Sequence, residues 1–432
     1  MRKKLVLVVL LLVAGLALAA CDDTDGTQGV TDTKIYVGNT AAVSGALATV
    51  GLPFNSAIEA VFERVNAAGG IDGRTIEFIS YDDEFNAEKG LTFTEQLIEE
   101  DEVFALVGHF GTPTVGATLD MIQSVGIPMV YAATGINDLY FEQSPGNPVM
   151  AVQPIYLTDG RLMAARAIKE AVYGENGDAA LAADAKVGVL YTNDDVGTSI
   201  KEGIEIEAGV LDKADDFIYE TVTELTVSTA VEALKTAGVE TVILAMNQVP
   251  FSYSVTALAD GGLNVPVFSS YVNADVSAVA PSSLTDIYVN AWVDLTSESG
   301  AADVADFVDA ISSSSLSDEQ KNSYYTNSFA TAGYIAAMIF VEGLERVAAN
   351  GDELTWENYI AAMEESEIDV PLGGTVDFSG GKRWGIDSMS LLKYTYSYGD
   401  DPSTTDVVED DFLLESFVKV AEIETLTEIE SK

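Results

Sequence analysis

Residues 103–114 read Val103-Phe104-Ala105-Leu106-Val107-Gly108-His109-Phe110-Gly111-Thr112-Pro113-Thr114, and this is the stretch that decides the fold class. Five consecutive apolar residues followed by a glycine predict a short strand that is buried on both faces. Thr112 and Pro113 then predict the start of a helix, with the threonine as N-cap and the proline at the first helical position. A buried strand that leads directly into a helix is typical of a parallel α/β sheet.

The same alternation of strand and helix extends along the chain on both sides of this stretch. Strands are expected at 34–38, 75–81 and 128–132, and helices at 53–68 and 88–100. A second series follows, with helices at 157–173, 198–208, 227–237 and 250–260 and strands at 186–191, 217–221, 241–246 and 266–269. The two series predict two parallel α/β sheets with right-handed connections.

The pattern becomes less regular after the second series. A strand is expected at 287–295, a long helix at 324–349 and another helix at 356–365. Two further strands are expected at 376–378 and 389–396, on either side of a glycine turn.

The N-terminus predicts export from the cytoplasm. Arg2, Lys3 and Lys4 precede an apolar run that is too short for a lasting membrane span, and Leu18-Ala19-Ala20-Cys21 resembles a bacterial lipobox. The resemblance implies a signal peptide over 1–20, cleavage before Cys21, and a lipid on the sulfur of Cys21. Residues 21–32 then form a flexible spacer. The alternative is an ordinary secretory signal with a cysteine just past the cleavage site.

The composition is strongly acidic, with 21 basic and 69 acidic residues and a formal net charge of −48 at pH 7. Nucleic acid and anionic lipid are disfavoured as partners, because both are bound through basic patches. The acids are scattered along the chain, which favours a solvated acidic surface suited to salty surroundings. Capture of a cation or a basic ligand is the alternative.

Several kinds of catalytic chemistry are disfavoured by what the sequence lacks. His109 is the only histidine and Cys21 the only cysteine, so they cannot build a typical zinc site, a Ser-His-Asp triad or a Cys-His pair. No phosphate-binding glycine motif and no nucleophile elbow follows a strand. We therefore expect no cofactor, no metal and no enzymatic activity, although a carboxylate pair or an oxygen-ligand metal site stays open in so acidic a chain.

An ordered set of short motifs resembles one family, the type I periplasmic binding proteins. The resemblance is to the branched-chain amino-acid (leucine/isoleucine/valine) class of ABC-transporter substrate-binding proteins, and it covers residues from about 33 to about 398. It rests on Val43-Ser44-Gly45, Asn66-Ala67-Ala68-Gly69-Gly70-Ile71-Asp72-Gly73, Tyr81-Asp82-Asp83, Leu106-Val107-Gly108-His109, Gly126-Ile127-Pro128-Met129 and Ala132-Ala133-Thr134.

The resemblance implies an α/β fold with two Rossmann-like lobes, each built on a parallel sheet and joined by a three-strand hinge. The crossovers are expected near 150–154, 287–294 and 372–378. Lobe one would comprise 33–152 plus 292–374, and lobe two 153–291 plus 375–425. A ligand would bind between the lobes, beyond the carboxyl ends of the strands.

The resemblance also implies which residues of lobe one hold the ligand. Thr112 matches a family position that grips the ligand carboxylate, and it lies in a turn with Phe110 and Gly111 where free backbone N–H groups and the helix dipole suit an anion. Thr112 could instead be only an N-cap. Ala132 and Thr134 match positions that meet the ligand ammonium. His109 matches a residue beside the pocket, and a purely structural role is the alternative.

Lobe two departs from the family pattern. Tyrosines of the leucine-type site fall near Val50 and Val196, and a third aromatic position falls near Asn247. The family carboxylate that pairs with the ligand ammonium falls near Tyr271, where no acid is in register. An uncompensated buried ammonium is costly, so either another acid substitutes or the ligand is not a standard α-amino acid. The candidate acids are Asp194, Asp195 and Asp275.

The expected function follows from the resemblance. The chain would be a lipid-anchored, extracytoplasmic solute-binding protein that delivers an amino-acid-like ligand, an amide or a carboxylate to an ABC permease. The alternatives are a sensory module that docks on a signalling receptor and a surface hydrolase that uses a carboxylate pair.

Overall fold

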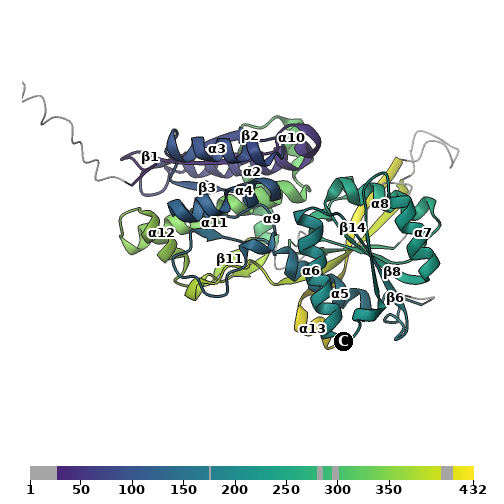
Figure 1. Cartoon of the computed structure of the whole chain (residues 1–432). Coiled ribbons are helices and arrows are strands. Elements are labelled where there is room, and N and C mark those ends of the chain that lie inside the picture. Colours follow the sequence, from purple (N-terminus) through teal and green to yellow (C-terminus); the bar gives the residue numbers. More distant parts are fainter. Residues whose placement is uncertain (1–26, 175–176, 280–285, 294–300, 400–411) are drawn as a thin grey trace, which may run out of the picture.

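The computed structural model describes residues 27–174, 177–279, 286–293, 301–399 and 412–432. The predicted signal peptide, Cys21 and most of the spacer therefore lie outside the described residues. Two α/β lobes lie side by side (Figure 1), each with a central sheet and helices packed on it.

The first lobe is built on a five-stranded sheet in which every pairing is parallel, with the order β2-β1-β3-β4-β5. Short β3, β4 and β5 are fully buried, as expected of strands covered on both faces. The strands are β1 (Lys34–Ala41), β2 (Thr75–Asp82), β3 (Ala105–Val107), β4 (Met129–Val130) and β5 (Val149–Met150). The helices are α2 (Ala48–Ala67), α3 (Ala87–Glu99), α4 (Thr112–Val125), α9 (Ala301–Ser313), α10 (Asp318–Tyr324), α11 (Ser328–Asn350) and α12 (Trp356–Met363), with a small hairpin of β11 (Ile368–Val370) and β12 (Gly374–Val376).

The second lobe is built on a seven-stranded sheet, with the order β14-β13-β10-β9-β8-β6-β7. Five strands are parallel, and β13 and β14 add an antiparallel hairpin at one edge. The strands are β6 (Lys186–Tyr191), β7 (Phe217–Thr221), β8 (Val239–Ala245), β9 (Val267–Ser269), β10 (Ile287–Ala291), β13 (Ser388–Gly399) and β14 (Phe412–Thr425). The helices are α5 (Tyr156–Lys169), α6 (Asp195–Val210), α7 (Val227–Ala237), α8 (Gln248–Asp260) and α13 (Leu426–Glu430).

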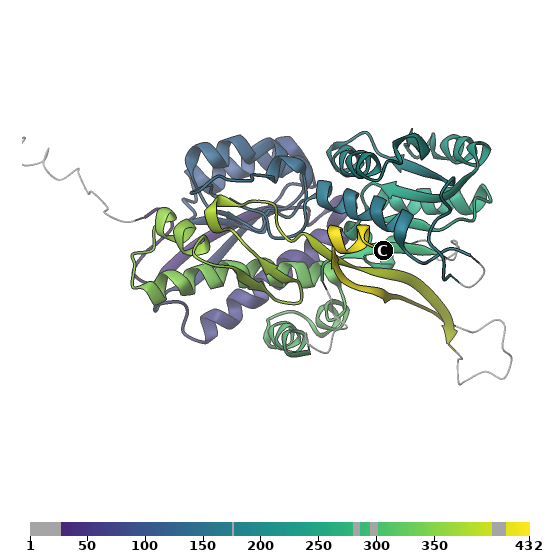
Figure 2. The ribbon, with the colours of Figure 1, turned by 90° about the horizontal axis from the view of Figure 1, so that it is seen from below.

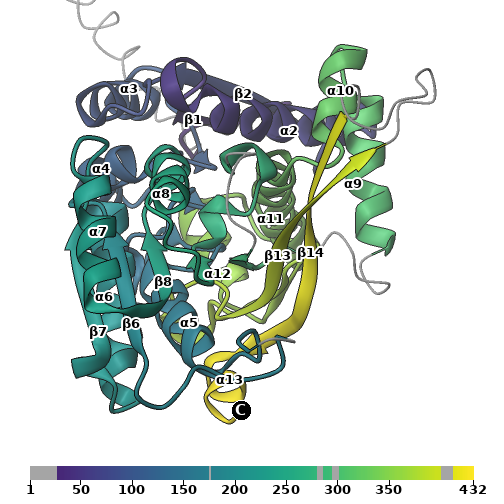
Figure 3. The same cartoon turned by 90° about the vertical axis from the view of Figure 1, so that its right-hand side faces the viewer.

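Strand β14 and its antiparallel pairing were not predicted. The hairpin β13–β14 extends away from the body of the molecule (Figure 2), and its two strands run side by side (Figure 3). The expectation of a purely parallel second sheet is therefore wrong at this edge. Residues 418–424 alternate apolar and charged side chains over most of their length, a strand pattern that the sequence analysis did not use.

Two predicted elements near the C-terminal part of lobe one also differ from the structure. The long helix expected at 324–349 is α11, which begins at Ser328 because the side chain of Asn327 accepts hydrogen bonds from the N–H groups of Phe329 and Ala330 and caps it. Helix α10, which ends at Tyr324, was not predicted. Of the strand expected at 376–378 only Val376 lies in a strand, at the end of β12, which pairs with β11 and not with β13.

The chain crosses into the second sheet for the last time at Ser388, later than the expected crossover near 372–378. The segment before it is held on lobe one, since Phe141 and Arg383 form a β-bridge. The buried guanidinium of Arg383 donates to the carbonyl oxygen of Asn147 (2.7 Å) and pairs with Glu364 (2.5 Å). Arg383 therefore holds the segment before Ser388 against lobe one.

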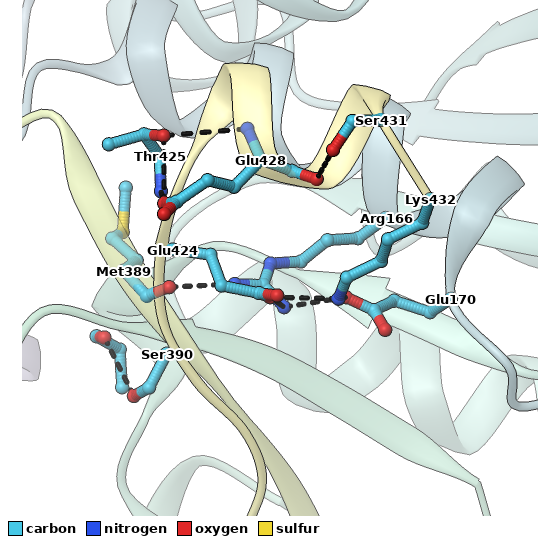
Figure 4. Close-up of polar contacts among 10 residues, drawn as sticks. Arg166, Glu170, Met389, Ser390, Glu424, Thr425, Glu428, Ser431 and Lys432 are labelled. Carbon is cyan, nitrogen blue, oxygen red and sulfur yellow. Dashed lines mark hydrogen bonds and ion pairs between the residues drawn. The ribbon is translucent and has the colours of Figure 1, made fainter.

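A buried charged cluster attaches the C-terminal hairpin to α5 (Figure 4). The side chain of Arg166 is fully buried, and it contacts Glu170 (2.8 Å) and Glu424 on β14 (3.4 Å). Its guanidinium also donates to the carbonyl oxygen of Met389 (2.6 Å) on β13. Lys432 closes the cluster at 2.8 Å from both carboxylates.

Helix α2, together with the short turn before it (Gly45–Ala67), is long and apolar enough to cross a membrane by length and composition. More than half of its most apolar stretch is buried inside the fold, because α2 packs against β2 and α11. Burial in the core of lobe one accounts for its composition.

Candidate functional site

A cavity of about 600 Å³ lies between the two lobes. Lobe one contributes the start of α2, the turn before α4 and the residues after β4. The opposite side comes from the start of α5, from the loops after β8 and β9, and from the hairpin β13–β14. Trp292, on the crossover after β10, continues the lobe-one side. The cavity therefore lies beyond the carboxyl ends of parallel strands, where open α/β sheets bind their ligands.

The turn between β3 and α4 forms one wall of this cleft through Phe110, Gly111 and Thr112. Gly111 has φ +100°, a conformation that favours glycine, and it is the N-cap of α4. The helix begins at Thr112, so the prediction that Thr112 is the N-cap is wrong by one residue. In the first helical turn Pro113 has no N–H group, and the N–H of Val115 donates to the carbonyl oxygen of Gly111 (2.9 Å). The N–H groups of Thr112 and Thr114 have no acceptor within the helix, and they can bind an anion.

The hydroxyl of Thr112 faces Thr134 instead of capping the helix. The two hydroxyl oxygens are 2.7 Å apart, and the hydroxyl of Tyr156, at the start of α5 in lobe two, lies 3.4 Å from Thr112. The structure therefore brings together two residues that the sequence analysis proposed. The Thr112–Thr134 contact connects the turn before α4 to the segment after β4, and the Thr112–Tyr156 contact connects the same turn to lobe two.

The segment after β4 is only partly exposed to the cleft. Ala133 lines it, whereas Ala132 and Thr134 are buried and are absent from its lining. Gly135 follows, and a Cβ atom there would lie 2.7 Å from the ring of Tyr156 and 2.8 Å from the hydroxyl of Tyr271. The glycine is required here because lobe two approaches closely.

His109 lies behind the turn and not in the cleft. Its side chain is fully buried, its Nδ1 accepts a hydrogen bond from the N–H of Thr40 (3.5 Å), and its Nε2 lies 3.2 Å from the hydroxyl of Thr118. Burial lowers the pKa of His109 to about 3, so the imidazole is neutral. The structure favours the structural role over a ligand contact.

Two of the three residues proposed on lobe two line the cleft. Asn247 and Tyr271 do so, and the hydroxyl of Tyr271 donates to the carbonyl oxygen of Pro154 (2.7 Å) and accepts from the side chain of Gln153 (2.9 Å). Val196 is buried in the first turn of α6 and is absent from the lining. The proposal of Val196 is not supported by the geometry.

Charge is scarce in the cleft. Asp275 is the only charged side chain among the described residues that line it, and its carboxylate lies 3.4 Å from the hydroxyl of Ser328 on lobe one. Asp194 is instead the N-cap of α6, where it accepts from the N–H of Gly197 (2.9 Å). Among the described residues, no three His, Cys, Asp or Glu side chains gather as metal ligands would.

The sequence analysis missed the aromatic character of the cleft. Nine of its lining residues are aromatic, and they come from elements far apart in the chain: Phe54, Phe85, Phe110, Tyr131, Tyr156, Tyr271, Trp292, Phe329 and Phe417. Only Phe110 and Tyr271 were proposed in advance. An aromatic residue in a sequence is more often part of a core, so local sequence offers no signal that would separate these from the others.

Two lobes joined by crossover strands, with a cleft lined from both sides, define a two-lobed solute-binding architecture. The sequence model of the family described as periplasmic binding protein matches residues 34–399, so the chain belongs to the periplasmic binding protein family. The fold is that of type I members, and the predicted resemblance to the branched-chain amino-acid class is confirmed. The family implies a location outside the cytoplasm.

Individual relatives are distant. The "Leu/Ile/Val-binding protein homolog 1" of Brucella abortus is 25% identical over 64% of this chain and 71% of its own length. The "Amino acid binding protein" of Pseudomonas aeruginosa is 27% identical over 22% of this chain, and the match spans only 25% of that relative. Among solved structures, the "Fatty acid ABC transporter substrate-binding protein from Thermomonospora curvata" has a TM-score of 0.71 at 20% identity, with coverage of 95% of this chain and 97% of that one.

Proposed function

We propose that this protein is an extracytoplasmic solute-binding lipoprotein of an ABC importer, tethered through a lipid on Cys21. It captures a small ligand, which is a branched-chain amino acid or a related amino acid, amide or carboxylate, and delivers it to a membrane permease. The observation that carries the proposal is the cavity of about 600 Å³ between the lobes, with the first turn of α4 on its wall. No covalent chemistry is required.

In this proposal the first turn of α4 binds the carboxylate of the ligand. Thr112 lines the cleft, where its backbone N–H and its hydroxyl are the donors offered to the carboxylate. Thr134 and Tyr156 hold that hydroxyl in place (2.7 and 3.4 Å), so part of the ordering cost is met before the ligand arrives. Ala132 and Thr134 then act behind Ala133 and not at the ligand.

Release and capture follow from movement of the lobes. We propose that residues 33–152 and 292–386 move as one body, and residues 153–291 and 387–432 as the other. Side chains from both bodies line the cleft, so a bound ligand stabilises the closed arrangement and shifts the equilibrium toward it. The closed form is the one presented to the permease.

The test is ligand-dependent thermal stabilisation of the purified full chain across amino acids, amides and carboxylates. A ligand at about 100 times its Kd adds about 2.7 kcal/mol to the free energy of unfolding, which is visible as a rise of some degrees in Tm. Absence of any shift across such a panel would contradict the proposal.

The role of Thr112 is tested by Thr112→Val. We expect Kd to rise about 10- to 100-fold, since a hydrogen bond to a charged group contributes about 1.5–3 kcal/mol. Thr118→Val is the matched control, because Thr118 is a buried threonine of the same helix whose hydroxyl donates to the carbonyl oxygen of Thr114 (2.8 Å), away from the cleft. Calorimetric titration of both folded variants should show weaker binding only for Thr112→Val.

A further inference from the structure

A continuous row of aromatic rings follows the lobe-one side of the cleft. Neighbouring ring centroids are 6.5, 5.5, 5.9 and 6.2 Å apart in the order Phe85, Phe110, Phe54, Tyr131 and Trp292. All five rings line the cavity. The row begins beside the turn that starts α4, and it ends at Trp292, on the crossover after β10.

The opposite wall is aromatic as well. The rings of Tyr156 and Tyr271 are stacked with their centroids 6.2 Å apart. The hydroxyl of Tyr271 is already paired with Pro154 and Gln153. Burial raises the pKa of Tyr271 well above its usual value, so it stays neutral. The two walls therefore present apolar ring surface to whatever lies between them.

The cleft has little that could compensate a positive charge. No Lys or Arg and one acid, Asp275, stand among the described lining residues, and Asp275 is contacted by Ser328 from the facing lobe. An ammonium group enclosed here would lose its water shell, and cation–π attraction to the rings with one carboxylate already contacted by Ser328 would replace only part of that hydration. A carboxylate, by contrast, meets the N–H groups of the α4 turn at the start of the ring row.

We propose that the ligand is a monocarboxylate with an apolar hydrocarbon or aromatic body and without an α-ammonium group. Its carboxylate binds the first turn of α4, and its body lies between the ring row and the Tyr156–Tyr271 stack. This inference rests on the proposed function and narrows its ligand class.

Matched ligand pairs provide the test, by isothermal titration calorimetry on the purified full chain. Each pair differs only in whether the α-carbon bears an ammonium group: 3-phenylpropionate against phenylalanine, and 4-methylpentanoate against leucine. We expect the acid without the ammonium to bind at least tenfold more tightly in both pairs. Equal or tighter binding of phenylalanine or leucine overturns the inference. The neutral amide 3-phenylpropanamide should bind more weakly than the acid, and equal binding would overturn the carboxylate contact.

Asp275→Asn gives a second readout. If Asp275 pairs with a ligand ammonium, the substitution weakens amino-acid binding tenfold or more, which contradicts the inference. If the ligand is a monocarboxylate, Kd for 3-phenylpropionate stays unchanged or falls, since a like charge has been removed. Asp215→Asn, at an exposed acid of the same lobe outside the cleft lining, is the control and should leave both affinities unchanged.

The outcomes separate this inference from the proposed function. Binding of amino acids alone leaves the protein a solute-binding protein and refutes only the ligand class. Failure of amino acids, amides and carboxylates alike refutes both.

Discussion

His109 and Asp159 show how burial sets the charge of single side chains behind the cleft. His109 is fully buried and its pKa is lowered to about 3, whereas burial raises the pKa of Asp159, on α5, to about 7. Asn290 on β10 donates to Asp159 (2.8 Å), which links α5 to the strand before the second crossover. Both side chains are neutral in the folded protein in mildly acidic solution, because a buried charge without a partner of opposite charge is costly.

The pH dependence of stability tests the state of His109. The pKa of an unfolded histidine is near 6.5, so the unfolded chain takes up a proton below this pH while the folded protein does not until about pH 3. His109 therefore costs stability as the pH falls from 6.5 toward 3, by about 1.4 kcal/mol per pH unit. His109 is the only histidine in the chain, which makes the effect assignable.

His109→Gln should remove that dependence. Between pH 7.5 and 5.5, the wild type should lose about 1.4 kcal/mol more of its free energy of unfolding than the variant, measured by urea denaturation. The contribution of Asp159 runs in the opposite direction, because its raised pKa stabilises the fold at low pH and the benefit is lost as the pH rises. It cancels when the two proteins are compared. Parallel curves for wild type and variant would refute a neutral His109.

At the scale of elements, the C-terminal hairpin and α13 depend on a buried charged cluster. Arg166 on α5 contacts β13 and β14 through Met389 and Glu424 (Figure 4). Its side chain is fully buried, whereas that of Lys432 is 31% exposed. Arg166 should therefore contribute much more than Lys432 to the free energy of unfolding, although both contact the same two carboxylates.

Arg166→Met should cost about 3–5 kcal/mol of unfolding free energy, because it leaves two partly buried carboxylates without their main partner. Lys432→Met is the control and should cost about 1 kcal/mol or less, as expected of an exposed ion pair. Urea denaturation of both variants measures the difference. Equal costs would show that the cluster is no more than a surface feature.

At the scale of the whole molecule, net charge opposes folding. A formal charge of −48 on one chain produces self-repulsion that salt screens, since the Debye length falls from about 10 Å at 0.1 M to about 3 Å at 1 M. We expect Tm to rise by about 5 °C or more between low and molar KCl, with most of the rise below about 0.5 M. A Tm that stays flat over this range would argue against adaptation to salt.

Several local features were readable from the sequence. The buried strand expected at 103–107 is present as β3 (Ala105–Val107), and helix α4 follows at Thr112, because apolar runs, proline and glycine act on the neighbouring backbone. The turn at 110–112 lines the cleft because the loop between a parallel strand and the following helix lies at the carboxyl edge of the sheet. The choice of Asn247 and Tyr271 followed from this rule, whereas Val196 lies inside helix α6 and not in the loop before it, and it is absent from the cleft lining.

The composition of the cleft was decided by the tertiary structure. Phe54 and Tyr131 are 77 residues apart in the chain, and Tyr131 and Trp292 are 161 apart, yet their rings form one row. Periodicity and turn chemistry report contacts within a few residues, and these contacts establish the lobes. The nature of the ligand depends on side chains brought together by the packing of distant elements, which no local pattern encodes.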